Sequence, residues 1–252
     1  MMTRGTVGAL LAYVVAIPVH AATITVTNTN DSGPGSLRQA LADANRGDTI
    51  TFAVTGTIEL TSAELVIDKP ITISGPGSNL LAVSRTSNTP FRIFHVMRPS
   101  RTVNIEGLTM SGGYAQFDYG GGILTDHAAL TVTNCSVVGN IASAGGGIYS
   151  DGATLAIVGS TIIGNGAGGS FAAGGGIYST ATLTIINSTI NDNSAIGDFE
   201  VSGSGGGIAG GGTIINSTIA GNHAALSGGR YRRWGYNHEL YNQEQFGWRW
   251  PE

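Results

Sequence analysis

The stretch of sequence that decides the fold is Gly174-Gly-Gly-Ile-Tyr-Ser-Thr-Ala-Thr-Leu-Thr-Ile-Ile-Asn-Ser-Thr-Ile-Asn-Asp-Asn193. Its opening Gly-Gly-Gly-Ile also begins at Gly120, Gly145 and Gly205, so successive copies lie 25, 29 and 31 residues apart. Repetition at this spacing is typical of solenoids. Short runs rich in Thr and Ile that are bounded by Gly and Asn are typical of strands. The sequence therefore predicts one coil of parallel strands for each repeat.

Each repeat also carries fixed polar positions between its strands. Two columns lie six residues apart, and they contain Asn134, Gly159, Asn187 and Asn216, then Asn140, Asn165, Asn193 and Asn222. We interpret these Asn residues as a structural ladder, because Asn tolerates left-handed turns and its amide can bond along a stack. Between them, Cys135, Ser160, Ser188 and Ser217 lie two residues before Val137, Ile162, Ile190 and Ile219. A spacing of two puts both sets on one strand face, so we expect both to be buried, with Cys135 an inert thiol.

These motifs resemble those of a known family. The Gly-Gly-Gly-Ile and Ile-x-x-Asn boxes are similar to the Gly-Gly-Ala-Ile and Phe-x-x-Asn boxes of polymorphic outer-membrane proteins. Residues 25–45 resemble the opening of many secreted bacterial β-helix proteins. The resemblance implies an all-β, single-stranded, right-handed parallel β-helix of the pectin-lyase-like class.

The chain divides into three parts. Arg4 precedes an apolar run over residues 5–19 and a small-residue cleavage pattern ending at Ala21, so residues 1–21 are predicted to be a signal peptide. We therefore expect a secreted or outer-membrane surface location, with no transmembrane helix after cleavage. The β-helix is assigned to residues 22–229, with irregular rungs over 22–110 and the Gly-Gly-Gly-Ile repeats over 111–229.

The irregular rungs are expected to begin with a cap. Ser36-Leu-Arg-Gln39 is a capping-box pattern that predicts a short helix through Ala44. Alternating apolar and polar residues then predict strands at 49–52, 57–60, 65–67, 71–74 and 103–110.

Residues 230–252 depart from the pattern. All three Trp and four of the eleven Arg lie there, whereas residues 102–229 contain no Arg or Lys. A shifted reading frame restores Gly, Thr, Ile and Asn at repeat positions, so we interpret this tail as frameshift-derived and not as a nucleic-acid site. The alternative is a genuine capping tail. The chain would then be a truncated fragment, and its uncapped last rung would allow edge-to-edge self-association.

The strand after each glycine box presents the most informative surface. Its first outward position carries Leu124, Tyr149, Tyr178 and Ala209, and the second carries Asp126, Asp151, Thr180 and Gly211. Aromatic rings beside carboxylates suit carbohydrate. The variable loops 166–173 and 194–204, the second with Asp198, Phe199 and Glu200, are expected to wall this face. The alternative is an ordinary soluble β surface with a cross-rung Tyr pair.

Function is predicted from this face. We expect a non-catalytic, adhesin-like or glycan-binding surface protein, with a glycan or cell-surface partner. A carbohydrate-active enzyme using Asp126 and Asp151, stacked roughly 5 Å apart, is the alternative, and a structural stalk is the third hypothesis.

Residues 22–229 carry seven Lys and Arg against 13 Asp and Glu, which disfavours an acidic polymer as the ligand. No cofactor is expected, although the Asp pair could take Ca²⁺. His95, His127 and His223 have no ligand-like spacing, so no metal site is predicted.

Overall fold

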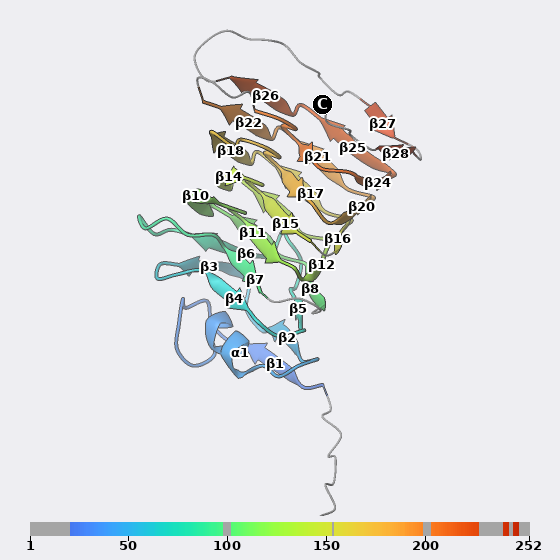
Figure 1. Ribbon diagram of the computed structural model, residues 1–252. Helices are drawn as coiled ribbons and strands as arrows, with labels where there is room; N and C mark the ends of the chain where they lie inside the picture. Colours follow the sequence, from blue (N-terminus) through green and yellow to red (C-terminus); the bar gives the residue numbers. More distant parts are fainter. Residues whose placement is uncertain are drawn as a thin grey trace, which may run out of the picture.

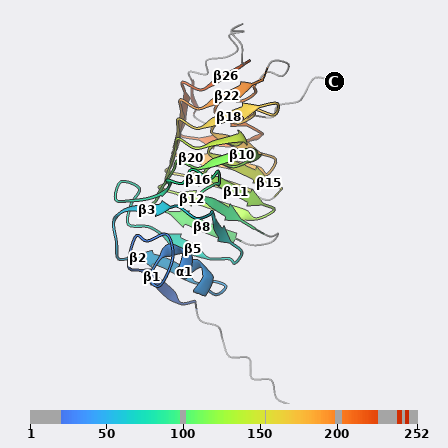
Figure 2. The same ribbon diagram turned by 90° about the vertical axis from the view of Figure 1, so that its left-hand side faces the viewer.

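The protein is a parallel β-solenoid of about seven turns, as the repeats predict. A computed structural model describes residues 21–97, 102–152, 154–198, 203–226, 239–241 and 244–246. Figure 1 shows the rungs stacked along one long axis, and Figure 2, turned by 90°, shows the helix α1 at the N-terminal end of the stack. The predicted signal peptide lies almost wholly outside the described residues, and its assignment stays a prediction.

Four sheets run along the axis, and each takes one strand from successive turns. The first contains β1 (Thr23–Val26), β2 (Thr49–Phe52), β5 (Thr72–Ser74), β8 (Thr102–Glu106), β12 (Ala129–Thr133), β16 (Thr154–Val158), β20 (Thr182–Ile186), β24 (Gly212–Ile215) and β28 (Glu244–Phe246). The second contains β3 (Gly56–Leu60), β6 (Leu81–Arg85), β9 (Thr109–Ser111), β13 (Ser136–Val138), β17 (Thr161–Ile163), β21 (Thr189–Asn191), β25 (Ser217–Ala220) and β27 (Glu239–Tyr241). The third contains β4 (Leu65–Ile67), β7 (Phe94–Val96), β11 (Ile123–Asp126), β15 (Ile148–Asp151), β19 (Ile177–Ser179) and β23 (Ile208–Ala209). The fourth contains β10 (Tyr114–Tyr119), β14 (Ile141–Ala144), β18 (Gly166–Gly169), β22 (Ser194–Gly197) and β26 (His223–Leu226).

Identical residues stack on one another where parallel strands keep the same register from one repeat to the next, whereas β10 and β14 shift register between Ala115 and Tyr119. Leu155 pairs with Leu183, and Ile157 pairs with Ile185. These side chains are at most 2% exposed and join one continuous apolar core. Burial of a Leu or Ile side chain contributes about 1.5–3 kcal/mol, so each added rung brings its own share of stability.

Two buried polar ladders run through this core. The Cys135 amide donates to Ser160 Oγ at 3.1 Å, and the Ser160 amide donates to Ser188 Oγ at 3.1 Å. The Asn140 amide nitrogen Nδ2 donates to Asn165 Oδ1 at 3.0 Å, and this pattern repeats from Asn165 to Asn193 at 2.9 Å. Polar groups can lie in the core because each rung satisfies the next.

The other Asn column forms corners. Asn134, Asn187 and Asn216 have φ of 51°, 50° and 47°, and Gly159 in the same column has φ of 58°. Asn and Gly enter this left-handed region at lower cost than other residues, so the chain turns there between the first and second sheets.

The N-terminal end is covered by the predicted helix. α1 spans Leu37–Asp43, and the Ser36 hydroxyl accepts a hydrogen bond from the Gln39 amide at 3.2 Å. Leu37 and Leu41 are buried against the core. The prediction of a short capping helix is therefore confirmed.

Three features differ from the sequence expectation. Strands β1, β6 and β7 belong to the irregular rungs but were not predicted, and the strand expected over 103–110 is divided into β8 and β9. The fourth sheet includes the starts of the two segments expected to be variable loops, since β18 and β22 pair in register. Their inward residues are small, as at Ala167 and Ala195, so these strands lack the β-branched pattern that predicted the others.

At the C-terminal end, two described pieces of the tail pair with the last rung. β28 is antiparallel to β24 and β27 is antiparallel to β25, whereas β23 and β26 have no further partner strand among the described residues. The frameshift origin of the tail and self-association at this end stay predictions. Within the described part of the chain, no helix has the length and apolar character needed to cross a bilayer.

Candidate functional face

The glycine boxes position the strands of the third sheet. A Cβ on Gly147 would lie 2.6 Å from the Gly176 carbonyl oxygen, and a Cβ on Gly176 would lie 2.7 Å from the Gly207 carbonyl oxygen. Only glycine allows backbones of adjacent rungs to approach this closely. The chain then enters a strand whose residues alternate between core and surface, as in β15, where Ile148 and Ser150 are buried and Tyr149 and Asp151 are partly exposed.

A stack of three tyrosines lies on the outward side of this sheet. Tyr149 pairs with Tyr178, and their ring centroids are 4.9 Å apart with an interplanar angle of 8°. Tyr119 stacks on the other side of Tyr149 at 4.6 Å and 16°. Burial, together with the neighbouring Tyr178 and Asp151, raises the pKa of Tyr149 to about 12. Both faces of the Tyr149 ring are covered, so the outer faces of Tyr119 and Tyr178 are the ones left at the two ends of the stack.

Tyr119 was not identified from the sequence because it precedes the glycine box, at the end of β10. The same position in the later repeats carries Ala144, Ala173 and Ser204. A single large aromatic residue in a column of small ones is the signal that could have identified it.

The carboxylates lie beside the stack. Asp126 and Asp151 pair in register, and Thr180 Oγ1 donates a hydrogen bond to Asp151 Oδ1 at 2.8 Å. His127 Nδ1 lies 2.5 Å from Asp126 Oδ1. One oxygen of each carboxylate and one nitrogen of His127 all lie within 4.8 Å of one another. The hydrogen bond to Asp126, with the charge of Asp151, raises the pKa of His127.

His127 is held at the corner after β11. Its φ is 53°, and its ring lies against Gly152, where an added Cβ would be 2.9 Å from His127 Cδ2. Ligand spacing along the chain does not relate His127 to Asp151, because the two residues are neighbours only through the stacking of adjacent rungs.

A second charged cluster lies beside β4 and β7, towards the N-terminal end of the same sheet, and includes Asp118 from β10 of the fourth sheet. Arg92 Nε lies 2.9 Å from Glu64 Oε2, Arg92 Nη2 bonds to Asp118, and His95 Nδ1 lies 3.0 Å from Glu64 Oε1. Although burial raises the pKa of Glu64, the hydrogen bond to His95 and the charges of Arg92 and His95 lower it overall. Among the residues that the structure describes, Arg92 is the basic residue nearest in sequence to the repeats. Two carboxylates, those of Glu64 and Asp118, neutralise its charge.

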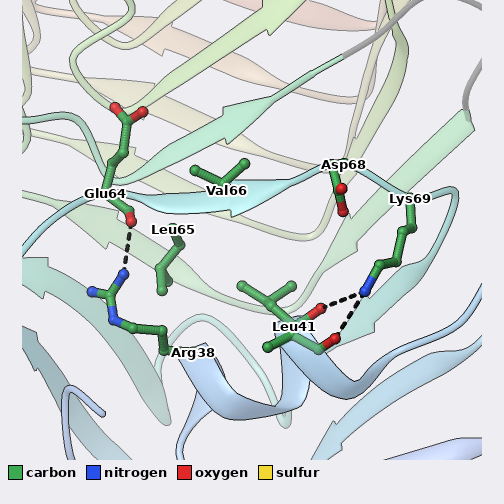
Figure 3. A pocket seen from close by; sticks show the side chains of 8 residues that line it. Arg38, Leu41, Glu64, Leu65, Val66, Asp68 and Lys69 are labelled. Atoms are coloured by element: carbon green, nitrogen blue, oxygen red, sulfur yellow. Dashed lines mark hydrogen bonds between the residues drawn. The ribbon is translucent and has the colours of Figure 1, made fainter.

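A groove of about 340 Å³ lies still closer to the N-terminal end, between α1 and β4 (Figure 3). Arg38 Nη1 donates to the Glu64 carbonyl oxygen at 2.8 Å, and Lys69 Nζ donates to the Ala42 carbonyl oxygen at 2.9 Å. Both cations therefore fasten the capping helix to the first rungs. None of the residues predicted to bind ligand lines this groove.

The expected wall of the face is described in part. Ser170 Oγ donates a hydrogen bond to Asp198, which joins the two variable segments. Phe199 and Glu200 lie outside the described residues.

Fold and face together define a parallel β-solenoid with a lateral surface of stacked tyrosines and clustered carboxylates. No protein-family model matches the chain, and no curated protein matches it. Among solved structures, it is similar to ORF18 of Geobacillus virus E2, with 17% identity and a TM-score of 0.47. The match covers 79% of this chain, which spans 41% of the length of that protein.

Proposed function

We propose that this protein is a secreted or outer-membrane-associated surface β-solenoid that binds glycan, in the manner of an adhesin, through the face of the third sheet. The observation that carries the proposal is the Tyr119, Tyr149 and Tyr178 stack beside Asp126 and Asp151. Aromatic rings pack against the apolar faces of sugars, and carboxylates accept hydrogen bonds from sugar hydroxyls.

The geometry favours the end of the stack as the place for a sugar ring. Tyr149 is sandwiched between two rings. Tyr178 has Tyr149 on one side and pairs on the other side with Ala209, whose small methyl group covers little of the Tyr178 ring. Thr180 and Asp151, already joined by a hydrogen bond, lie on the neighbouring outward positions. A sugar on Tyr178 would have hydrogen-bonding groups beside it.

The test is binding of neutral glycans to the full chain, first on an array and then by calorimetry for each hit. We expect Tyr178→Ala to abolish binding, and Tyr114→Ala, a tyrosine on the fourth sheet, to leave it unchanged. Equal affinity in the two variants, or no glycan bound by the wild type, would overturn the proposal.

The proposed location is tested by the mass of the exported protein, since cleavage of the signal peptide is expected to leave a chain that begins near Ala22.

A carbohydrate-active enzyme is the second candidate, favoured by the two carboxylates on adjacent rungs. One oxygen of Asp126 and one oxygen of Asp151 lie within 4.8 Å of each other, close to the carboxyl separation of about 5–5.5 Å in retaining glycosidases. The two groups also have different partners, because Asp126 bonds to His127 and Asp151 bonds to Thr180. Release of reducing ends from a neutral polysaccharide that disappears in Asp126→Asn and Asp151→Asn would favour this function. A chain with neither binding nor turnover would fit the structural stalk.

A further inference from the structure

We propose that Asp126, His127 and Asp151 form a site for a divalent transition-metal cation, with Zn²⁺ as the representative ion. The inference does not depend on glycan binding. It starts from the placement of three ligating groups from two adjacent rungs, all within 4.8 Å of one another.

The donor set selects the type of metal. One imidazole nitrogen and two carboxylate oxygens suit zinc, which bonds to His nitrogen at about 2.0–2.1 Å and to carboxylate oxygen at about 2.0–2.2 Å. Calcium prefers six to eight oxygen ligands, so an imidazole among so few donors disfavours it. In the free protein His127 Nδ1 and Asp126 Oδ1 are joined directly at 2.5 Å, and a small outward rotation of either side chain would admit the ion between them.

The surrounding structure holds two of the ligands in place. The missing side chain of Gly152 leaves room for the His127 ring, since an added Cβ would lie 2.9 Å from Cδ2 and 3.2 Å from Nε2. The Thr180 hydroxyl donates to Asp151 Oδ1 and accepts from the Gly152 amide at 3.1 Å. Hydrogen-bonded neighbours of this kind orient ligands and raise metal affinity.

The local charge independently favours a cation. Residues 102–229 contain no Lys or Arg, so within these repeats the two carboxylates face no permanent positive charge. Asp126 is exposed and Asp151 is partly exposed, which leaves an ion free to enter from solvent. Water would complete the coordination of zinc on the outward side.

The test is zinc binding to the full chain, freed of any histidine tag, by isothermal titration calorimetry. We expect one Zn²⁺ per chain in the wild type, and affinity lower by at least about 10-fold in His127→Asn and in Asp151→Asn. Asn tolerates the left-handed backbone at position 127, and far-UV circular dichroism confirms that both variants are folded. His223→Ala, at an exposed histidine on β26, is the matched control and should bind as the wild type does.

Two further measurements make the result decisive. Co²⁺ should give visible absorption bands with the wild type that are lost in His127→Asn, because the imidazole is a ligand. Ca²⁺ in 100-fold excess should leave Zn²⁺ bound. Wild-type affinity in His127→Asn, or displacement of Zn²⁺ by Ca²⁺, would overturn the proposal.

Discussion

Replacement of Asn165 by Ala should destabilise the whole solenoid. Asn165 is 1% exposed, and its Nδ2 donates to the Val137 carbonyl oxygen at 2.9 Å and to Asn193 Oδ1 at 2.9 Å. Its Oδ1 accepts from the Asn140 backbone amide at 3.0 Å and from Asn140 Nδ2 at 3.0 Å. The truncated side chain would leave the Asn140 amide and the Val137 oxygen without these partners inside the core.

The magnitude follows from those two groups. A buried polar group that loses its partner costs about 1–3 kcal/mol, so the free energy of unfolding should fall by about 2–6 kcal/mol. This is a large part of the 5–15 kcal/mol that is usual for a folded domain. The lost amide volume adds a smaller cost in the same direction.

The assay is urea unfolding followed by far-UV circular dichroism, with stability taken from the midpoint at constant slope. Asn191→Ala is the matched control, because the Asn191 side chain bonds only to exposed Asp192 among the contacts described, and it should change stability by less than about 0.5 kcal/mol. Asn222→Ala, on the last ladder rung and partly exposed, should lie between the two. An Asn165→Ala midpoint equal to that of Asn191→Ala would refute the assignment of the ladder as a main source of stability.

Three other changes have expected outcomes. Burial tends to raise the pKa of Asp31, but hydrogen bonds from Arg38, Ser62 and Thr61 outweigh it and hold that pKa at about 2, so Asp31 stabilises the fold above its unfolded pKa of about 3.9. In urea titrations, wild type should therefore exceed Asp31→Asn in stability at pH 6, and the difference should vanish as the pH falls towards 2. A constant difference would contradict the conclusion that ionised Asp31, bonded to Arg38, Ser62 and Thr61, stabilises the fold. Burial raises the pKa of the Cys135 thiol to about 11, so a thiol reagent should label native protein far more slowly than protein in urea, and rapid native labelling would show that the thiol is accessible. Gly147→Ala should prevent folding or destabilise it by more than about 3 kcal/mol, because the methyl group would meet the Gly176 oxygen at 2.6 Å, whereas Gly168→Ala, whose nearest atom is at 4.0 Å, should be tolerated.

The repeat region was largely predictable because its pattern and its packing express the same periodicity. Ile157, Ile185 and Ile214 stack in the structure because each lies two residues before the corner position of its repeat, which is Gly159, Asn187 or Asn216. The second outward position was predictable for the same reason, and Asp126 does pair with Asp151. Strand alternation after a fixed turn leaves little freedom in which side chains share a face.

Elsewhere the pattern was insufficient. β7 (Phe94–Val96) was not predicted, and its place is fixed by pairing with β4 and β11. The fourth sheet is built on small side chains such as Ala142, which carry no strong strand preference. Tyr119 and His127 join the candidate face through contacts between rungs, and a spacing rule along one repeat cannot detect such contacts. For the same reason, the free faces of the tyrosine stack could be located only once the ring orientations were known.

The unequal repeats have a mechanical consequence. Hydrogen bonds between rungs run along the solenoid axis, so a force that separates the two ends along this axis would load the rungs one after another. Each detached repeat would release a length set by its residue count, and extended chain measures at most about 3.3–3.6 Å per residue. Repeats of 25, 29 and 31 residues would therefore lengthen the molecule in successive steps of about 85, 100 and 105 Å. The order of these steps would reveal from which end the solenoid unravels.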